Sequence, residues 1–310
     1  MLLVGAGPMA LDHSKVLDAL NVEHTVIGRS KNSALKFESA TGHRVVQGGL
    51  AKYISCVDQL PNQAIVSVGV EELAETTKLL ILKGVKYILL EKPAGLTIKE
   101  ITDLSKVAKN YNATVYVAYN RRFFSSVLNA QKIIQEDGGV QNFTFEITEW
   151  GHTIEPLEKA PGVKENWFLG NTSHVVDLAF HLGGLPKSIN CYTSGKLPWH
   201  NRSAIFAGSG ESENGALFSY QGNWGAPGRW SLDIITQRHR LIFKPLEKLQ
   251  IQQLGSIAIE EIPLDDKLDH NYKSGLYMQC NSFIQGTNKN LCSLEEHIKS
   301  CLFYEKMAGY

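Results

Sequence analysis

The chain has 310 residues, enough for two domains with separate hydrophobic cores, which excludes a small protein held together by disulfides. Its 31 basic residues equal its 31 acidic residues, so no net charge attracts nucleic acid or an anionic membrane surface. A hydrophobic fraction of 43% and a charged fraction of 20% are typical of globular proteins and argue against extended disorder.

Cysteine usage and hydropathy indicate a cytoplasmic protein. The five cysteines are scattered and form no C-x-x-C pair, which argues against a disulfide framework and against a structural zinc site. The apolar N-terminal run contains two glycines and a proline and lacks the basic residues of a signal peptide. No apolar run reaches the ~18 residues of a transmembrane helix. We therefore expect a protein that binds neither membranes nor nucleic acid.

Short apolar runs alternate with longer helical patterns from the N-terminus to about residue 120. This alternation is typical of β-α-β units and predicts a doubly wound parallel sheet. Thr97 and Glu100 are placed to form a capping box at the start of the last of these helices. The expected strands cover residues 2–4, 25–27, 45–46, 64–70, 87–90 and 114–118, and the clearest helices cover 71–83 and 98–109.

The pattern changes after residue 120. A helical stretch at 124–136 is followed by runs of alternating apolar and polar residues, which are typical of antiparallel strands with one buried face. All five tryptophans lie in this part of the chain. The sequence therefore predicts a second, α+β domain after residue 120, with a mostly antiparallel sheet and closing helices at 272–285 and 294–307.

A glycine-rich loop follows the first predicted strand. Its sequence, Gly5-Ala-Gly7-Pro8-Met9-Ala, has the form G-x-G-x-x-A, and a helical pattern comes directly after it. The first glycine permits a tight turn, the second lets the backbone approach a pyrophosphate, and the helix N-terminus favours the negative charge. The loop therefore predicts a dinucleotide site on these residues. His13 shares the apolar face of the helix, which favours a packed core histidine.

The turn after the second strand bears on the choice of cofactor. NAD-binding sheets usually carry an acidic residue here for the ribose 2′-hydroxyl, but this chain reads Gly28-Arg29-Ser30-Lys31. A guanidinium and a hydroxyl suit a 2′-phosphate, so Arg29 and Ser30 favour NADP over NAD. The alternative is a solvated basic turn without a role in binding.

Glu91-Lys92-Pro93 follows the fifth predicted strand. Ligands of open α/β sheets bind beyond the carboxyl ends of the strands, which places Lys92 where chemistry occurs. Glu91 is placed to hold the ammonium or a neighbouring group, and Pro93 favours an extended backbone at Lys92. Glu91 and Lys92 are therefore predicted cofactor-site residues, and Lys92 is a predicted catalytic residue. The alternative is a surface lysine at a strand end.

A helix predicted at 173–183 is apolar nearly all round, which indicates burial. Its polar stripe consists of His174, Asp177 and His181, which share one side of the helix. Because burying these groups without polar partners is costly, we expect the stripe to face a wet pocket or a hydrogen-bonded network. The spacing also suits metal ligands, but no further ligand residue stands nearby, so no metal is predicted.

Together these motifs resemble the glucose-fructose oxidoreductase, inositol dehydrogenase and rhizopine-catabolism (Gfo/Idh/MocA) family. The resemblance rests on the G-x-G-x-x-A loop at 5–10, on E-K-P at 91–93, on Y-N-R-R-F at 119–123 and on H-V-V-D at 174–177, which Leu-Gly follows. Most members oxidise or reduce sugars, polyols or their derivatives with NADP or NAD.

The resemblance implies that the chain has two domains with different roles. A Rossmann domain at 1–120 binds NAD(P), and an α+β domain at 121–310 is built on an open, mostly antiparallel sheet. The second domain serves substrate binding and oligomerisation, which implies a homodimer or homotetramer.

The resemblance also assigns roles on the polar helix. The family motif D-x-G-x-H-x-x-D places the acid-base histidine on His174 and the second aspartate on Asp177, whereas the first aspartate falls on Gly170 and is missing. Either residues 171–173 take over its role, or the working pair is Asp177 with His181 in a shifted register. We favour His174, because the shifted register leaves only two residues of helix after the histidine.

We therefore expect an NAD(P)-dependent oxidoreductase that moves a hydride between nicotinamide and a sugar, polyol or sugar-derivative alcohol or ketone. His174 moves the hydroxyl proton, and Lys92 stabilises the developing alkoxide. Two alternatives stay open: a nicotinamide-dependent enzyme that cleaves glycosides, and a cofactor-binding protein without activity. Arginine among the substrate residues suits a carboxylate or phosphate. The candidate substrate-binding residues are Asn120, Arg121, Arg122, Trp167 and His181.

Overall fold

The computed structural model describes residues 1–310, and the chain divides into two compact units. The first unit comprises Met1–Asn120 and Leu268–Ile298, and the second comprises Arg121–Lys267 and Lys299–Tyr310. None of the helices is both long and apolar enough to cross a bilayer.

The first unit is built on a seven-stranded sheet, whose strands are β1 (Leu2–Val4), β2 (Thr25–Gly28), β3 (Val45–Gln47), β4 (Gln63–Val66), β5 (Tyr87–Leu90), β6 (Thr114–Val117) and β15 (Cys292–Ser293). Their order is β15-β6-β5-β4-β1-β2-β3. All neighbours run parallel except β15, which is antiparallel to β6. This arrangement confirms the doubly wound parallel sheet that the sequence predicts.

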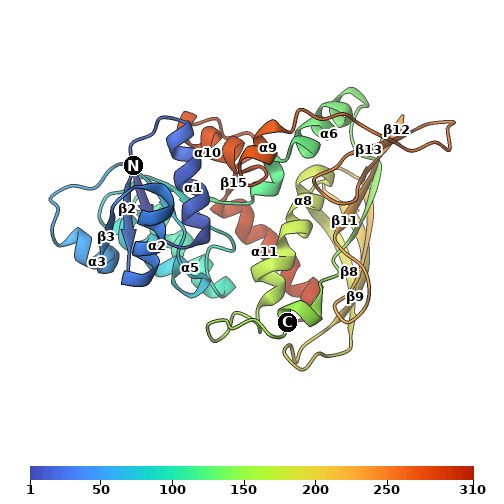
Figure 1. The fold of residues 1–310 in the computed structure, drawn as a ribbon. Helices are drawn as coiled ribbons and strands as arrows, with labels where there is room; N and C mark the ends of the chain where they lie inside the picture. The colour runs from blue at the N-terminus through green and yellow to red at the C-terminus, as the bar shows by residue number, and fades with distance from the viewer. The chain divides into compact units, whose positions relative to one another are not determined.

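Helices connect these strands (Figure 1). Thr97 caps α5 as predicted, because its Oγ1 accepts from the Glu100 backbone N–H at 3.3 Å. The Glu100 carboxylate accepts from the Leu96 N–H at 2.9 Å. In a standard capping box the donor is one residue later, at the N-cap itself. The helices are α1 (Pro8–Ala19), α2 (Lys31–Thr41), α3 (Gly49–Ile54), the 3-10 turn η1 (Val70–Glu72), α4 (Leu73–Leu82), α5 (Ile98–Asn110), α9 (Lys267–Asn271) and α10 (Leu276–Gln285).

The chain returns to the first unit near its C-terminus, which the sequence-based division into 1–120 and 121–310 does not anticipate. Cys292–Ser293 pairs with the edge of β6, and α10 packs beside α1. A two-residue strand carries no local signal of the distant strand that it joins. A pattern read along the chain therefore assigns 268–298 to its sequence neighbours.

The second unit is built on an eight-stranded sheet, whose strands are β7 (Asn142–Glu146), β8 (Pro186–Ser194), β9 (Ile205–Ser212), β10 (Leu217–Asn223), β11 (Ser231–Ile235), β12 (His239–Phe243), β13 (Gln250–Gln253) and β14 (Glu260–Glu261). Their order is β14-β13-β12-β11-β7-β10-β9-β8. β7 and β10 are parallel, and all other neighbours are antiparallel. The mostly antiparallel sheet is therefore confirmed.

One face of this sheet is covered by α8 (Ser173–Gly183) (Figure 1). Phe180 of this helix packs against Phe143 and Phe218, with ring centroids 6.3 and 5.4 Å away. The last residue of the helix, Gly183, leaves no room for a side chain, because a Cβ there would lie 2.3 Å from the Phe143 ring. The other helices of this part of the chain are the 3-10 turn η2 (Asn120–Phe123), α6 (Ser125–Glu136), α7 (Gly151–Ile154), the π-helical turn η3 (Phe168–Thr172) and α11 (Leu294–Ala308).

A buried carboxylate ties the end of α6 to the turn between β11 and β12. The Asp137 side chain is 1% exposed and accepts from Thr236 Oγ1 at 2.5 Å. It also accepts from Arg238 Nε at 2.8 Å and lies 2.7 Å from His239 Nδ1. Burial alone would raise the pKa of Asp137, but these partners outweigh it and hold the pKa below its usual value.

We expect Asp137→Asn to lower the free energy of unfolding at neutral pH by about 1.5 to 3 kcal/mol, because a buried network loses its charged acceptor. Since the folded pKa is depressed, this stabilisation is complete above the unfolded pKa of about 3.9 and is lost as the pH falls through the folded value. Urea unfolding across this pH range measures both effects. Asp233→Asn, which breaks the more exposed pair with Arg240, is the control. Equal losses in the two variants would contradict the assignment.

Candidate functional site

The glycine-rich loop between β1 and α1 requires glycine at its first position. Gly5 has a φ of +129°, and a Cβ there would lie 2.1 Å from the Ser67 carbonyl oxygen. Gly7 is the N-cap of α1, and a Cβ there would meet no atom within 4 Å. The loop therefore packs tightly on Ser67 on one side and leaves open space over Gly7.

The N-terminus of α1 is open to an anion. No side chain caps it, and no acidic residue occupies its first turn. Pro8 stands at the start of the helix, where its missing N–H costs no helical hydrogen bond. The remaining first-turn N–H groups and the helix dipole therefore favour a negative charge over the loop.

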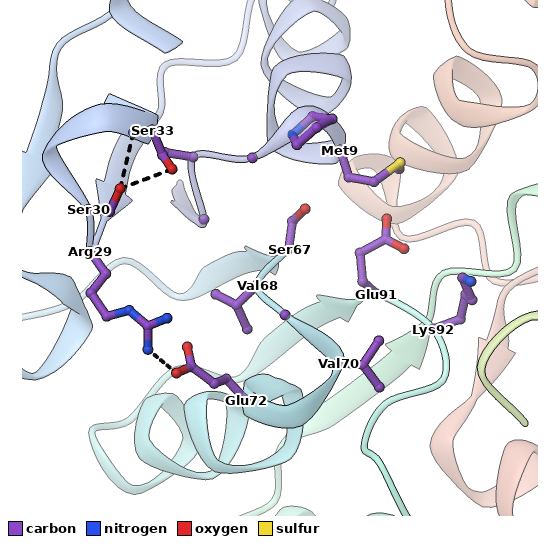
Figure 2. Close-up of a pocket in the computed structure, with 15 residues that line it drawn as sticks. Met9, Arg29, Ser30, Ser33, Ser67, Val68, Val70, Glu72, Glu91 and Lys92 are labelled. Atoms are coloured by element: carbon purple, nitrogen blue, oxygen red, sulfur yellow. Dashed lines mark hydrogen bonds and ion pairs between the residues drawn. The ribbon is translucent and has the colours of Figure 1, made fainter. Parts of the chain in front are cut away.

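A cavity of about 500 Å³ lies at the carboxyl ends of β1, β2, β4 and β5 (Figure 2). Its size is that of a typical small-molecule or cofactor site. Its walls include all of the residues predicted for the cofactor, namely Gly5, Gly7, Pro8, Met9, Arg29, Ser30, Glu91 and Lys92.

At one end of the cavity, Arg29 pairs with a residue that the sequence did not single out. Its guanidinium forms an ion pair with Glu72, which lies in η1 just beyond β4 (Figure 2). The two side chains are 72% and 37% exposed. Ser30 caps α2, because its Oγ accepts from the Ser33 N–H at 3.1 Å. Both predicted residues line the cavity, but a carboxylate stands beside the arginine.

Glu91 pairs with a histidine of α1. His13 Nε2 lies 3.0 Å from Glu91 Oε1, and His13 Nδ1 lies 3.4 Å from Cys280 Sγ. Burial alone would lower the pKa of His13, but Cys280 and the Glu91 carboxylate raise it to about 10. His13 is fully buried, which confirms the predicted core histidine. Glu91 therefore holds α1 in place below the cavity.

Lys92 lies at the end of the cavity away from Arg29 (Figure 2). The Lys92–Pro93 peptide bond is cis. The Pro93 carbonyl accepts from His297 Nε2 at 2.9 Å, and His297 Nδ1 lies 3.5 Å from the Tyr119 hydroxyl. Both His297 and Tyr119 are buried. They fix the turn that carries Lys92, and His297 is too far along the chain to be linked with it from sequence.

Two of the predicted substrate residues are engaged in packing. Asn120 Nδ2 donates to the Ser274 carbonyl at 2.8 Å within the first unit. In the second unit, Trp167 is 9% exposed and packs edge-on against Trp199 at a centroid distance of 6.0 Å. These contacts favour structural roles for both side chains.

The helix α8 has the bounds that the sequence predicts, and it follows the π-helical turn η3. Such turns are rare and often mark functional sites. His174 stands in the first turn of the helix, is buried, and has its ring centroid 6.2 Å from that of Trp230. At Gly170, where the family motif carries an aspartate, a Cβ would meet no atom within 4 Å.

Asp177 forms a two-pronged ion pair with Arg122. Arg122 Nε donates to Asp177 Oδ2 at 2.8 Å, and the terminal nitrogen Nη2 donates to Oδ1 at 2.6 Å. The two side chains are 1% and 3% exposed. The polar stripe therefore belongs to a hydrogen-bonded network, one of the two expected outcomes. This geometry does not favour Arg122 as a substrate ligand, because its guanidinium is committed to Asp177.

We expect Asp177→Ala to lower the free energy of unfolding by about 3 to 5 kcal/mol, because it leaves the Arg122 cation buried without its main partner. Thermal and urea unfolding measure this loss. Glu211→Ala, which breaks the exposed pair with Lys187, is the control and should leave stability nearly unchanged. A folded Asp177→Ala protein with the stability of the parent would contradict a structural role for the pair.

His181 is bound to a different helix. Its Nε2 accepts from Gln131 Nε2 of α6 at 2.9 Å, which places the ring proton on Nδ1. Burial and the nearby Arg122 cation hold the pKa of His181 well below its usual value, so it is neutral at neutral pH. Because Asp177 pairs with Arg122 and His181 with Gln131, the shifted register that joins Asp177 to His181 is not favoured.

Glu149 supplies a buried carboxylate to the turn before His174. It is 1% exposed, and its Oε1 accepts from Asn171 Nδ2 at 2.9 Å and from Thr172 Oγ1 at 2.7 Å. Residues 171–173 are the segment that the sequence offers in place of the missing aspartate. The only available signal was an acidic residue shortly after β7, and sequence alone could not place it beside η3.

The sequence of this chain resembles that of a known enzyme over only part of its length. No known family profile matches the chain. Over 108 residues it is 26% identical to the scyllo-inositol 2-dehydrogenase (NADP⁺) of Bacillus subtilis, a match that covers 34% of this chain and only 30% of that enzyme.

Solved structures match over nearly the whole chain. Levoglucosan dehydrogenase in complex with NADH and L-sorbose has a TM-score of 0.80 at 17% identity and covers 99% of this chain and 95% of its own. UDP-N-acetylglucosamine 3-dehydrogenase from Acidithiobacillus ferrooxidans has a TM-score of 0.75 at 13% identity and covers 99% and 96%. Both are dehydrogenases of the Gfo/Idh/MocA type.

This chain has the Gfo/Idh/MocA fold. The fold that the resemblance implies is thereby confirmed. The glycine-rich loop and Lys92 lie in the first unit of this chain, and the polar helix lies in the second.

Proposed function

We propose that the protein is an NAD(P)-dependent oxidoreductase that acts on a sugar-type alcohol or ketone. The observation that carries the proposal is the cavity of about 500 Å³ at the carboxyl ends of the parallel strands. It is lined by the glycine-rich loop at one wall and by Lys92 at one end. Structures of the same fold in complex with NADH and a sugar, such as levoglucosan dehydrogenase, support it.

The residues that line the cavity fit a dinucleotide. Open space over Gly7 and the uncapped N-terminus of α1 suit a pyrophosphate. Arg29 and Ser30 stand where the adenine ribose would lie, and Lys92 stands at the opposite end. When bound, the cofactor supplies a nicotinamide ring that accepts or delivers a hydride.

Lys92 and His174 are the proposed catalytic residues. The Lys92 ammonium stabilises the oxygen of the reacting carbinol as negative charge develops on it. His174 removes or returns the hydroxyl proton. Asp177, paired with Arg122, fixes the helix that carries His174 and so acts as a positioning residue.

Turnover with a panel of carbohydrates tests the proposal. Sugars, polyols, uronic acids, sugar phosphates and nucleotide sugars are offered with NADP⁺ and NAD⁺, and the corresponding ketones with NADPH and NADH. We expect net reduction or oxidation of the cofactor with at least one member. Glycoside cleavage without net change of a tightly held cofactor would support the glycosidase alternative. Cofactor binding without any turnover would support a non-catalytic protein.

Arg29 underlies the proposed preference for NADP. A 2′-phosphate offers the guanidinium charge-assisted hydrogen bonds of about 1.5 to 3 kcal/mol each, more than the exposed pair with Glu72 provides. We expect NADPH to bind more tightly than NADH, and Arg29→Asp to reverse this order. Calorimetric titration of both cofactors measures the effect.

Glu72 provides a second test of the same preference. Its carboxylate repels a 2′-phosphate and competes for Arg29, so Glu72→Gln should increase the preference for NADPH. Glu75→Gln breaks the exposed pair with Lys78 on the following helix and serves as the control. Equal or tighter binding of NADH by the unaltered protein would contradict the assignment.

We also propose that the open face of the eight-stranded sheet joins copies of the chain into a homodimer or homotetramer. Residues alternate between buried and exposed along β7 and β10. Leu217 of β10 and Ile205 of the neighbouring β9 are 63% and 43% exposed. Light scattering coupled to size exclusion measures the mass, and a monomer at micromolar concentration would contradict the proposal.

A further inference from the structure

Two arginines of the second unit stack on one buried tryptophan. The Arg121 guanidinium carbon lies 5.0 Å from the centroid of the Trp230 ring, and that of Arg229 lies 4.6 Å from it. Arg229 also lies 4.9 Å from the ring of Trp150. Trp230 is 4% exposed, and its indole N–H has no acceptor in the protein. The cluster is called the arginine–tryptophan site below.

Arg121 lacks a counterion of its own. Its side chain is half-buried, and its guanidinium donates no hydrogen bond and forms no ion pair within the chain. Burial lowers the pKa of Arg121 to about 10, and the cation therefore persists at neutral pH. A partly desolvated guanidinium with unused N–H groups is costly to maintain in a folded protein, which favours a role in binding.

Neither carboxylate near the site pairs directly with Arg121. Glu149 lies 3.5 Å from Arg229 but is also bound by Asn171 and Thr172. Glu247 acts on Arg121 without forming an ion pair with it. Of the two arginines, Glu149 therefore pairs with Arg229 alone, and the Arg121 guanidinium keeps N–H donors for a further anion.

The site is adjacent to the proposed acid-base residue. The His174 and Trp230 ring centroids are 6.2 Å apart, so the ring that supports both arginines also contacts the histidine. A group bound by the arginines would therefore lie beside the same tryptophan as His174. This proximity ties the site to the substrate.

We propose that the substrate carries an oxyanion, a carboxylate or a phosphate, which Arg121 and Arg229 bind while the Trp230 and Trp150 rings support the guanidinium groups. The inference rests on the proposed function and narrows its substrate class to anionic sugar derivatives. Planar guanidinium groups present paired N–H donors that match both oxyanions. A neutral sugar would leave the Arg121 cation without a partner.

Matched substrates test the proposal. Glucose and galactose are compared with glucuronate and galacturonate, with glucose 6-phosphate and galactose 6-phosphate, and with UDP-glucose and UDP-galactose. The uronates and the phosphates distinguish the two sources of the oxyanion. We expect a higher kcat/KM for at least one charged member than for its neutral parent, and quenching of tryptophan fluorescence by that member at lower concentrations.

Variants of the two arginines test whether these residues bind the charged group of the substrate. Arg229 is 45% exposed, so Arg229→Gln should fold, and we expect it to raise KM for the charged substrate by about tenfold or more, with a smaller change in kcat. Arg121→Gln should act in the same direction. Arg202→Gln is the matched control, because Arg202 is exposed and stacks on a different ring, that of Tyr310, at 4.1 Å.

The outcomes separate the two proposals. Equal kcat/KM and equal fluorescence titrations for neutral and charged members would overturn the oxyanion site and leave the oxidoreductase proposal standing. An unchanged KM in Arg229→Gln would do the same. Tighter binding of charged members, lost in Arg229→Gln but without turnover of any panel member, would support the oxyanion site and contradict the oxidoreductase proposal.

Discussion

Lys92→Met is expected to lower turnover by about 10² or more, the scale of one lost electrostatic contact in the transition state. Methionine keeps the length of the side chain and removes its charge. The turn that carries Lys92 is held by the buried His297 and Tyr119. The melting temperature should therefore remain near that of the parent.

A lysine at the other end of the same strand provides the control. Lys86 precedes β5 at its amino end, and its ammonium donates to the Tyr111 carbonyl at 2.6 Å. Lys86→Met changes the same charge away from the cavity and should leave turnover intact. Normal turnover in Lys92→Met, or equal losses in the two variants, would reduce Lys92 to a structural lysine.

His174→Ala is expected to lower turnover by about 10² to 10⁴ and to remove one limb of the pH profile, as loss of a general acid or base does. His181→Ala should instead cost mainly stability, because it removes the acceptor of the Gln131 amide. Both proteins require a check of folding by thermal unfolding before their kinetics are compared.

The pH profile adds a second distinction between the two histidines. The pKa of His181 is held well below its usual value by burial and by Arg122, so this residue stays neutral through the neutral range. A kinetic limb that survives in His181→Ala and disappears in His174→Ala supports the assignment. A nearly normal His174→Ala enzyme beside a folded, inactive His181→Ala enzyme would reverse it.

Local patterns were sufficient to predict the sheets and the polar helix. The strand at 87–90 and the helix at 173–183 have the same bounds in the structure, because each combines a clear apolar period with turn residues at its ends. The pairing of Cys292–Ser293 with β6 could not be predicted, since its partner lies far away in the chain.

The site was predictable only where a strand end or a glycine loop marked it. Gly7, Arg29 and Lys92 follow strands whose carboxyl ends meet, so their shared cavity follows from topology. Side-chain partners do not follow from it. Glu72 contacts Arg29 from η1, and Glu149 contacts residues of η3 from beyond β7, so neither contact could be predicted from the sequence.

The fate of the hydride tests the central claim most directly. The protein is incubated with NADPH or NADH deuterated at the nicotinamide C4 and with a pooled panel of keto-sugars and their charged derivatives, and the products are analysed by mass spectrometry. The proposed function predicts deuterium on the carbinol carbon of at least one product, with little or none from His174→Ala. Tight binding of the reduced cofactor with no deuterium in any carbinol would contradict it.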